Sequence, residues 1–451
     1  MLLASCIFYM AFIPIYILIL FFTILIDYIA GIQIEKSAGS RRKAYLILSI
    51  IANVGVLAVF KYYNFFTTNV NELIQYLHFT VYPLPYLSII LPLGLSFHTF
   101  QAMSYTIEVY RGNYKAEKHA GIYALYVMYY PQLVAGPIER PQNIIHQLKI
   151  KHEFDYRRVS DGLKLMLWGL FKKVFIADRL SLTVNLIYND PHKYQGLTLI
   201  MATIMFSIQI YCDFSGYTDI ALGASKVMGI KLMENFRQPY FSKSVSEFWQ
   251  RWHISLSSWF YDYLFNGIVV VRRDWGKWAI VMGFIITFLI SGFWHGAGWT
   301  YIVWGLIHGI CLAVYFLFSG FRKSLSRRIA PGIYDAFSIF LTFSFVCFGY
   351  IFFRANSLSD AFYIVSHSFK GLSSLHDMKW ELSVLQITFL PRILLGIVLL
   401  LLVDYTNTKS DVIIEILRYP VWVRRIIYYA ILFLIFNYGV FANQQFIYFQ
   451  F

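Results

Sequence analysis

Two histidines stand in apolar, tryptophan-rich surroundings, and their imidazoles are suited to acid–base chemistry. His253 follows the run Glu247–Trp252, and His295 follows Gly292–Trp294 at the end of the next hydrophobic segment. With a pKa of ~6.5, a neutral imidazole can accept the proton of an alcohol near neutral pH. An ionisable group in a membrane segment also needs a partner, water or substrate to offset its desolvation. The pair therefore predicts a catalytic site; the alternative is that each is a packed, hydrogen-bonded core residue.

Other polar side chains fall at comparable places in hydrophobic runs. Asp213 and Asp219 lie six residues apart. The alternative to a functional role is a structural one, in which they cap helices or form ion pairs with Arg237 or Arg251. His308 follows His295 by thirteen residues and is more typical of a packing residue. We predict substrate-binding roles for a polar and aromatic set that consists of Gln132, Glu139, Arg140, Asp213, Asp219, Arg251, Trp252 and Trp294.

The residue spacing argues against several other kinds of site. The histidines lack the i, i+4 spacing of zinc hydrolases and the carboxylate that accompanies it, so no metal is predicted. The sequence contains neither a Walker loop nor a dinucleotide fingerprint. The four cysteines are scattered through hydrophobic segments, which predicts neither a disulfide framework nor a cysteine-rich metal site.

The composition shows what kind of element must position these residues. Of 451 residues, 58% are hydrophobic and only 14% are charged, with a mean hydropathy of +0.57, as in polytopic membrane proteins. The net charge of +14 lies in short loops between apolar runs, so it predicts membrane topology and not nucleic-acid binding. No polar linker separates two folding units. We predict one all-α membrane domain over residues 1–451, with core motifs at 87–310 and C-terminal spans and an aromatic tail at 333–451.

Loop charge orients the predicted spans. Residues 7–32 are apolar for too long to be a signal peptide, and the basic loop 35–43 that follows is cytoplasmic by the positive-inside rule. Segments 119–138 and 248–271 have cationic residues on both sides. We predict that the first re-enters the membrane and forms a wall of a site, and that the second re-enters or lies along the interface. The prediction totals about nine spans, including 44–66, 87–110, 161–188, 197–224, 278–294 and 299–319, with three more before residue 441.

Several motifs occur in the order found in the membrane-bound O-acyltransferase family. The chain resembles in particular the bacterial branch that contains the alginate O-acetyltransferase membrane subunit. The resemblance implies a ring of tilted helices around a central tunnel, with His295 as the catalytic base and His253 as its supporting polar residue. Besides the two histidine motifs, the matching stretches are Leu91–Phe97, Phe100–Tyr105, Pro131–Ile138, Asp213–Asp219 and Phe352–Ala355.

The chain departs from this family pattern in two places. One more hydrophobic segment usually precedes the stretch that resembles Leu2–Ser5, so we expect that this start site omits an N-terminal helix. After Asp262–Leu264 the family's Pro-Leu-Gly-Gly run is replaced by Phe265–Val271, and Tyr261 stands where an arginine is expected. The resemblance therefore predicts the reaction class more closely than the substrate.

The resemblance implies transfer of a short acyl group, with acetyl expected, to a hydroxyl of an envelope polysaccharide such as alginate. The donor would be a cytoplasmic thioester, acetyl-CoA or an acyl carrier protein, with no bound cofactor. The expected partner is an extracytoplasmic SGNH-type acetyl-transfer protein, and the expected location is the bacterial cell (inner or plasma) membrane. The alternatives are D-alanyl transfer to teichoic acid and a proton-coupled transporter, although the internal repeat typical of transporters is not evident.

The C-terminal residues Phe446–Phe451 form an aromatic ending with two interpretations. Aromatic side chains commonly anchor a protein at the membrane interface. The ending also resembles a Phe-x-Tyr-Phe-x-Phe motif of bacterial family members and of their small partner peptides. That resemblance implies that Tyr448 is a covalent acyl relay with His295 as its base, since a phenolate with a pKa of ~10 leaves more readily than an alkoxide.

Overall fold

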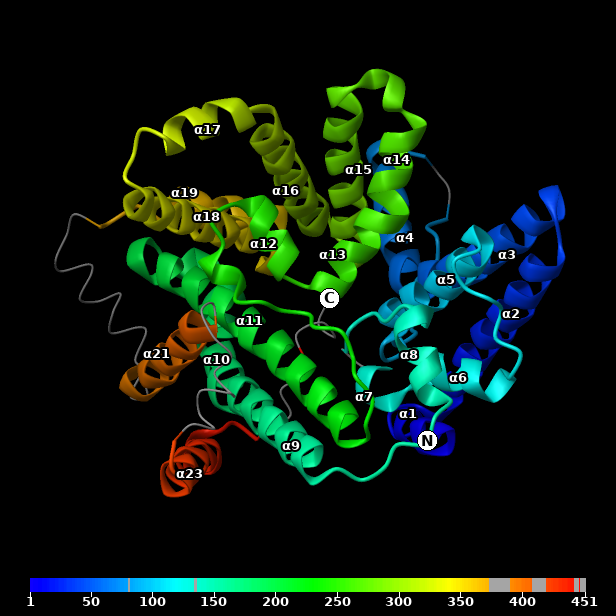
Figure 1. Cartoon of the computed structure of the whole chain (residues 1–451). Helices are drawn as coiled ribbons and strands as arrows, with labels where there is room; N and C mark the ends of the chain where they lie inside the picture. Colours follow the sequence, from blue (N-terminus) through cyan, green and yellow to red (C-terminus); the bar gives the residue numbers. More distant parts are fainter. Residues whose placement is uncertain (80–81, 134–135, 373–389, 408–418, 442–445, 447–451) are drawn as a thin grey trace. The chain divides into compact units, whose positions relative to one another are not determined.

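The protein is built from helices, as the composition predicts (Figure 1). A computed structural model describes residues 1–79, 82–133, 136–372, 390–407, 419–441 and 446. Over these residues it contains helices and one isolated antiparallel bridge, between Phe236 and Trp252, but no strand. The predicted all-α membrane fold is confirmed.

Seven helices of the described part are long and apolar enough to cross a membrane. The sequence predicts about nine spans, and two of those with stated bounds, 87–110 and 161–188, are not among the seven. In 87–110 the helix begins only at Leu95, and in 161–188 six charged residues interrupt the apolar run. The seven are Pro14–Lys36, Gly39–Tyr76, Gly196–Val227, Lys277–His295, Trp299–Leu317, Pro331–Arg354 and Val421–Tyr438, and a shorter apolar helix covers Ile393–Asn407.

The chain divides into two compact units. The first comprises residues 1–164 and 221–233, and the second comprises residues 165–220 and 234–451. The single domain predicted for residues 1–451 stays a prediction.

In the first unit, buried polar side chains satisfy one another between membrane helices. Its helices are α1 (Leu2–Met10), α2 (Ile17–Lys36), α3 (Gly39–Leu57), α4 (Tyr63–Tyr76), α5 (Leu95–Arg111), α6 (Ala120–Met128), α7 (Tyr130–Leu133), α8 (Pro141–Leu148) and the start of α9 (Tyr156–Leu170). The carboxylate of Asp27 on α2 accepts hydrogen bonds from Ser49 Oγ at 2.6 Å and from Asn53 Nδ2 at 2.8 Å. These bonds offset the cost of burying a carboxyl group among apolar side chains.

Two predicted boundaries in the first unit are wrong. The helix expected over residues 7–32 is divided into α1 and α2 at Pro14, because proline lacks an amide hydrogen and clashes with the preceding turn. The span predicted to end at residue 66 continues for ten more residues, because α4 ends only at Tyr76. The predicted re-entrant segment 119–138 contains the two short helices α6 and α7.

The second unit carries both candidate histidines. Its elements are the π-helical segment η3 (Phe171–Ala177), α10 (Asp178–Tyr188), most of α11 (Gly196–Val227), α12 (Val245–Arg251), α13 (Ile254–Phe260), the π-helical η6 (Tyr261–Phe265), α14 (Asn266–Val271), α15 (Lys277–His295), α16 (Trp299–Leu317), α17 (Ser319–Ser326), α18 (Pro331–Arg354), α19 (Leu358–His367), α21 (Leu390–Asn407) and α23 (Val421–Tyr438). The predicted amphipathic segment 248–271 is thus divided among α12, α13, η6 and α14.

Glycines let α15 and α16 pack side by side as a tight hairpin (Figure 1). A Cβ atom on Gly292 would lie 2.3 Å from the carbonyl oxygen of Tyr301, and one on Gly305 would lie 2.2 Å from that of Phe288. Small residues allow such close backbone contact between membrane helices. The hairpin places Trp304 of α16 against the last turn of α15.

A second close crossing joins the end of α9 to α11. A Cβ atom on Gly169 would lie 2.5 Å from the carbonyl oxygen of Gly216, and the reverse approach is 2.7 Å. The lysines of η3, which follows Gly169, therefore reach the acidic residues of α11.

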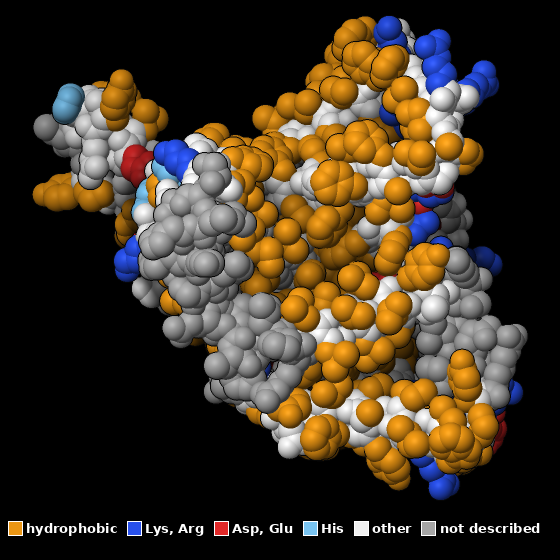
Figure 2. Space-filling model, turned by 90° about the vertical axis from the view of Figure 1, so that its left-hand side faces the viewer, with side chains coloured by type: hydrophobic (Ala, Val, Ile, Leu, Met, Phe, Trp, Pro, Cys, Tyr) orange, Lys and Arg blue, Asp and Glu red, His pale blue; other side chains and the backbone are white. Residues whose placement is uncertain are grey.

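Large hydrophobic side chains cover much of the face shown in Figure 2, and Lys and Arg lie mainly toward its edges. On α15 and α16 the exposed residues include Trp278, Ile290, Ile310 and Val314. An apolar surface of this extent is typical of protein in contact with lipid hydrocarbon.

Candidate active site

His253 occupies the break between α12 and α13, outside the seven spans. It has a left-handed backbone conformation with φ of +45°, which costs a non-glycine residue of order 1–3 kcal/mol. The neighbouring backbone holds it there: Ile254 N–H donates to the carbonyl of Asn235 at 3.0 Å, and Arg237 N–H donates to that of Arg251 at 2.9 Å. The imidazole is 1% exposed, and its ring centroid lies 4.6 Å from that of Phe214.

His295 is the last residue of α15, and aromatic rings surround it. Its side chain is 4% exposed, and its ring centroid lies 4.8 Å from Trp294, 5.0 Å from Trp304 and 5.4 Å from Phe353. The following turn requires Gly296, because a Cβ atom there would lie 2.1 Å from the ring of Tyr301. Both the hairpin and α18 therefore shape the pocket of this imidazole.

Trp294 contacts both histidines. Its ring centroid is 6.4 Å from that of His253 and 4.8 Å from that of His295, so the structure brings the two imidazoles to one aromatic cluster. Burial lowers the pKa of His253 to about 3, which keeps its imidazole neutral at physiological pH. A neutral imidazole can both accept and donate a proton through its two ring nitrogens.

The other two predicted residues of this motif have neighbours outside that cluster. Trp252 packs on Phe236 at 5.0 Å and Phe248 at 5.5 Å between ring centroids. Arg251 forms an ion pair with Glu247 at 2.6 Å. These contacts are structural, and the predicted substrate-binding roles of Trp252 and Arg251 stay predictions.

The predicted acidic residues of α11 are paired with lysines. Lys172 Nζ lies 2.7 Å from Asp219 Oδ2, and Lys173 Nζ lies 2.7 Å from Asp213 Oδ1 and 2.8 Å from Asp178 Oδ1. The sequence-based alternative paired these carboxylates with Arg237 or Arg251. The kind of contact, an ion pair, is correct, but the partners are lysines and not arginines. The Gly169–Gly216 crossing explains the outcome, since it brings η3 against α11.

Three predicted residues, Gln132, Glu139 and Arg140, belong to the first unit. Gln132 Nε2 donates to the carbonyl of Tyr126 at 3.2 Å. Glu139 is buried and accepts a hydrogen bond from Asn143 Nδ2 at 3.2 Å, and burial raises the pKa of its carboxyl group to about 7. The substrate-binding roles of these three residues stay predictions. Tyr448 lies outside the described residues.

The sequence did not identify three of the aromatic residues near the histidines. Trp304 and Phe353 contact His295, and Trp249 contacts Trp304 with 5.8 Å between ring centroids. Trp249 Nε1 also donates to His308 Nδ1 at 3.3 Å, which gives His308 the packing role that its spacing favoured. The sequence signals near these residues were the abundance of tryptophan around the two motifs and the family match of Phe352–Ala355, and neither indicated which rings contact the histidines. Among the described residues, no three His, Cys, Asp or Glu side chains are arranged to hold a metal ion.

The fold and site define a polytopic helical membrane protein in which two buried histidines contact the same tryptophan. More narrowly, the chain belongs to the membrane-bound O-acyltransferase (MBOAT) family, whose sequence model matches residues 119–352, more than half of the chain.

Relatives with named activities are similar over much of the chain. The probable alginate O-acetylase AlgI of Pseudomonas aeruginosa is 37% identical over 339 residues, 74% of this chain and 62% of that protein. The peptidoglycan O-acetyltransferase of Helicobacter pylori is 34% identical over 403 residues, 83% of this chain and 73% of that protein. The teichoic acid D-alanyltransferase of Bacillus subtilis is 31% identical over 270 residues, 58% of this chain and 68% of that protein. This chain spans 62% and 66% of the lengths of two of its alginate O-acetylase relatives.

Proposed function

We propose that this protein is an O-acetyltransferase that moves an acetyl group from a cytoplasmic thioester, across the membrane, to a hydroxyl of an envelope polysaccharide. The observation that carries the proposal is the placement of His253 and His295 against Trp294 in a member of the MBOAT family. A dry, preorganised site of this kind strengthens each hydrogen bond to a developing charge.

In the proposed reaction, a ring nitrogen of His295 accepts the proton of the acceptor hydroxyl. The hydroxyl oxygen then bonds to the thioester carbonyl carbon, the carbon–sulfur bond breaks, and the thiolate takes the proton from the imidazolium. Neutral His253 donates a hydrogen bond to the carbonyl oxygen, on which negative charge develops. Its low pKa suits a donor that does not itself ionise. The products are an ester and a thiol.

The acceptor polymer is proposed to be alginate or a similar envelope polysaccharide, because several relatives bear the name alginate O-acetylase. The Helicobacter relative supports peptidoglycan as a second acceptor. The D-alanyl alternative has support from relatives that match less of this chain. We place the enzyme in the bacterial inner or plasma membrane, with acetyl-CoA or an acyl carrier protein as donor and an SGNH-type protein as extracytoplasmic partner.

We also propose that Tyr448 relays the acyl group. Its phenol hydroxyl is then the first acceptor in the reaction above, and the polysaccharide hydroxyl next bonds to the carbonyl carbon of the aryl ester, which releases the phenol of Tyr448. The support comes from its described neighbour Phe446, which is 3% exposed and packs on Tyr217 at 4.7 Å and on Phe214 at 5.7 Å between ring centroids. Phe214 in turn contacts His253. Phe446, two residues before the tyrosine in the sequence, thus packs on a neighbour of His253.

The test uses membranes that contain the full-length protein, supplied with radioactive acetyl-CoA and separate alginate and peptidoglycan acceptors. We expect His295→Ala to lower ester formation by about 10²–10⁴-fold, the contribution of a general base, while membrane abundance is retained. Trp278→Ala, at an exposed position of the same helix, is the matched control. Normal turnover by His295→Ala would refute the assignment, and the acceptor that gains label identifies the polymer.

A further inference from the structure

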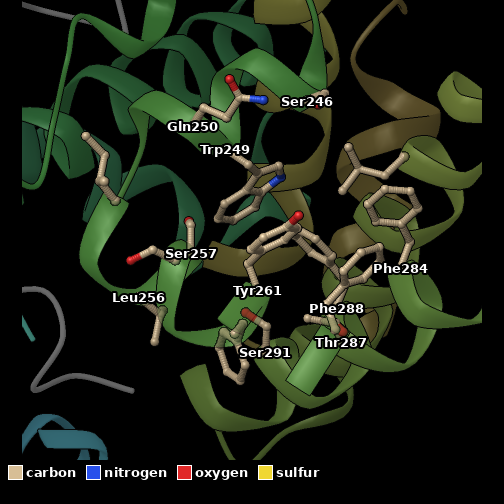
Figure 3. Close-up of a pocket in the computed structure, with 15 residues that line it drawn as sticks. Ser246, Trp249, Gln250, Leu256, Ser257, Tyr261, Phe284, Thr287, Phe288 and Ser291 are labelled. Atoms are coloured by element: carbon tan, nitrogen blue, oxygen red, sulfur yellow. The ribbon is translucent and has the colours of Figure 1, made fainter. Parts of the chain in front are cut away.

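A concave pocket of about 510 Å³ lies beside the candidate active site, between α12, α13 and η6 on one side and α15 and α16 on the other (Figure 3). This volume falls within the range of about 300–1,000 Å³ that is usual for small-molecule sites. Trp249 and Tyr261 lie near the centre of the view in Figure 3, opposite Phe284 and Phe288 of α15. The walls thus include the middle of a membrane span.

The lining chemistry selects a hydrocarbon ligand. Aromatic and aliphatic side chains make up most of the walls, and the polar groups are uncharged hydroxyls and one amide, such as Ser257, Thr287 and Gln250. None of the described residues that line the pocket carries a charge. A phosphate or carboxylate would therefore be desolvated there without a compensating cation, which is unfavourable.

The surroundings of the pocket indicate that the hydrocarbon comes from the bilayer. Tyr261, in the pocket wall, is 56% exposed. The helices that frame the pocket also expose aliphatic side chains such as Ile290 on α15 and Ile310 on α16. Each methylene buried from water contributes about 0.8 kcal/mol, so an apolar hollow on a lipid-facing surface favours a lipid chain over water.

Trp249 in the pocket wall and Trp304 behind it lie between this pocket and His295. Trp249 lines the pocket and packs on Trp304, and Trp304 contacts His295. His308 holds Trp249 in place through the indole hydrogen bond, and Gly349 provides the space that His308 needs, since a Cβ there would lie 2.9 Å from His308 Nε2. A chain in the pocket would thus be a resident component and not the reacting acyl group.

We infer that this pocket binds one acyl chain of a bilayer phospholipid, which completes the apolar wall behind Trp249. The chain packs against Phe284 and Phe288, and its head group stays outside. Neither His253 nor His295 lines the pocket, so the bound chain is distinct from the acetyl group that the proposed reaction transfers.

Photocrosslinking tests the inference on the full-length protein in vesicles of phosphatidylethanolamine and phosphatidylglycerol. The probe is a phosphatidylglycerol with a diazirine in one acyl chain, and mass spectrometry compares the label on the pocket-lining residues Phe284, Phe288 and Ser291 with the label on the exposed helix α23. In Thr287→Trp the new indole fills the pocket, and we expect the label on these lining residues to be lost, because the indole takes the space of the acyl chain.

Ile290→Trp is the matched control, because it adds a tryptophan to the lipid-exposed side of the same helix and should leave the label on the lining residues unchanged. Leu312→Trp fills the pocket from α16 and keeps the test valid if Thr287→Trp does not fold. Equal labelling of the lining residues in the pocket-filling and control variants, or no label on Phe284, Phe288 and Ser291 in the wild type, overturns the inference. Displacement of the label by octanoyl-CoA would also overturn it and would assign the pocket to a substrate chain instead.

Discussion

The ion pair between Lys172 and Asp219 allows a test of whether the acidic residues of α11 are structural. The two side chains are 5% and 20% exposed, and their charged atoms lie 2.7 Å apart. Lys172→Met would leave the Asp219 carboxylate without the cation that offsets its desolvation. Removing one partner of a buried pair costs about 3–5 kcal/mol of folding free energy.

Lys243→Met provides a control of equal geometry. Lys243 and Asp335 also lie 2.7 Å apart, but they are 50% and 41% exposed, and exposed pairs contribute about 0–1 kcal/mol. The measurement is the free energy of unfolding in mixed detergent micelles, determined for each variant. Burial alone therefore predicts a difference of several kcal/mol between two lysine-to-methionine changes.

The double variant Lys172→Met/Asp219→Asn separates structure from substrate binding. Removing both charges should bring stability back close to that of the wild type, because a buried ion pair can often be replaced by neutral groups at little cost. If Asp219 also binds substrate, acetyl transfer stays low in the stable double variant. The reasoning is refuted if Lys172→Met costs no more than Lys243→Met, or if the double variant is as unstable as the single one.

Three further predictions concern pH, topology and the tail. The free energy of unfolding of the wild type relative to that of His253→Asn should fall as the pH drops from 6.5 toward 3, because the imidazole binds a proton in the unfolded chain but not when it is buried. A difference that does not depend on pH would contradict this. In a background without native cysteines, probes at Ser40 and Ser326 should be shielded from an impermeant reagent in intact cells, whereas one at Tyr82, which is 94% exposed between α4 and α5, should react; the reverse pattern would invert the topology. Tyr448→Phe should abolish polysaccharide acetylation in a normally inserted protein, and full product formation would exclude the relay.

Local patterns made much of the fold predictable. The hydrophobic runs are long enough to identify most membrane helices, and charged loops mark where they end. The sequence also shows Pro14, a residue that breaks helices, but the predicted span was based on the length of the apolar run. The backbone of His253 was not predictable in this way, because a histidine indicates a left-handed conformation only weakly, and the hydrogen bond from Ile254 N–H to the carbonyl of Asn235 joins residues far apart in the sequence.

The site was predictable only as far as its chemistry is local. Each histidine motif stands out by itself, but Trp304 and Phe353 reach His295 from α16 and α18 through tertiary packing. The sequence also contains a signal for the ion pairs of the lysines, because two cations in an apolar run require counter-charges. Gly169 then determines which carboxylates they meet, by bringing η3 against α11.

The Gly169–Gly216 crossing has a consequence for how the protein is made. Lys172 leaves the ribosome before its partner Asp219, so the first segment must approach the bilayer with this lysine uncompensated, whereas Lys173 already has Asp178 in the same segment. A lysine at the centre of a helix opposes insertion by the translocon by about 2.5–3.5 kcal/mol. Residues 161–188 should therefore remain at the translocon until α11 is synthesised, and the two should enter the lipid together with Lys172 and Asp219 paired. The crossing thus predicts that the membrane insertion of residues 161–188 depends on the later synthesis of α11.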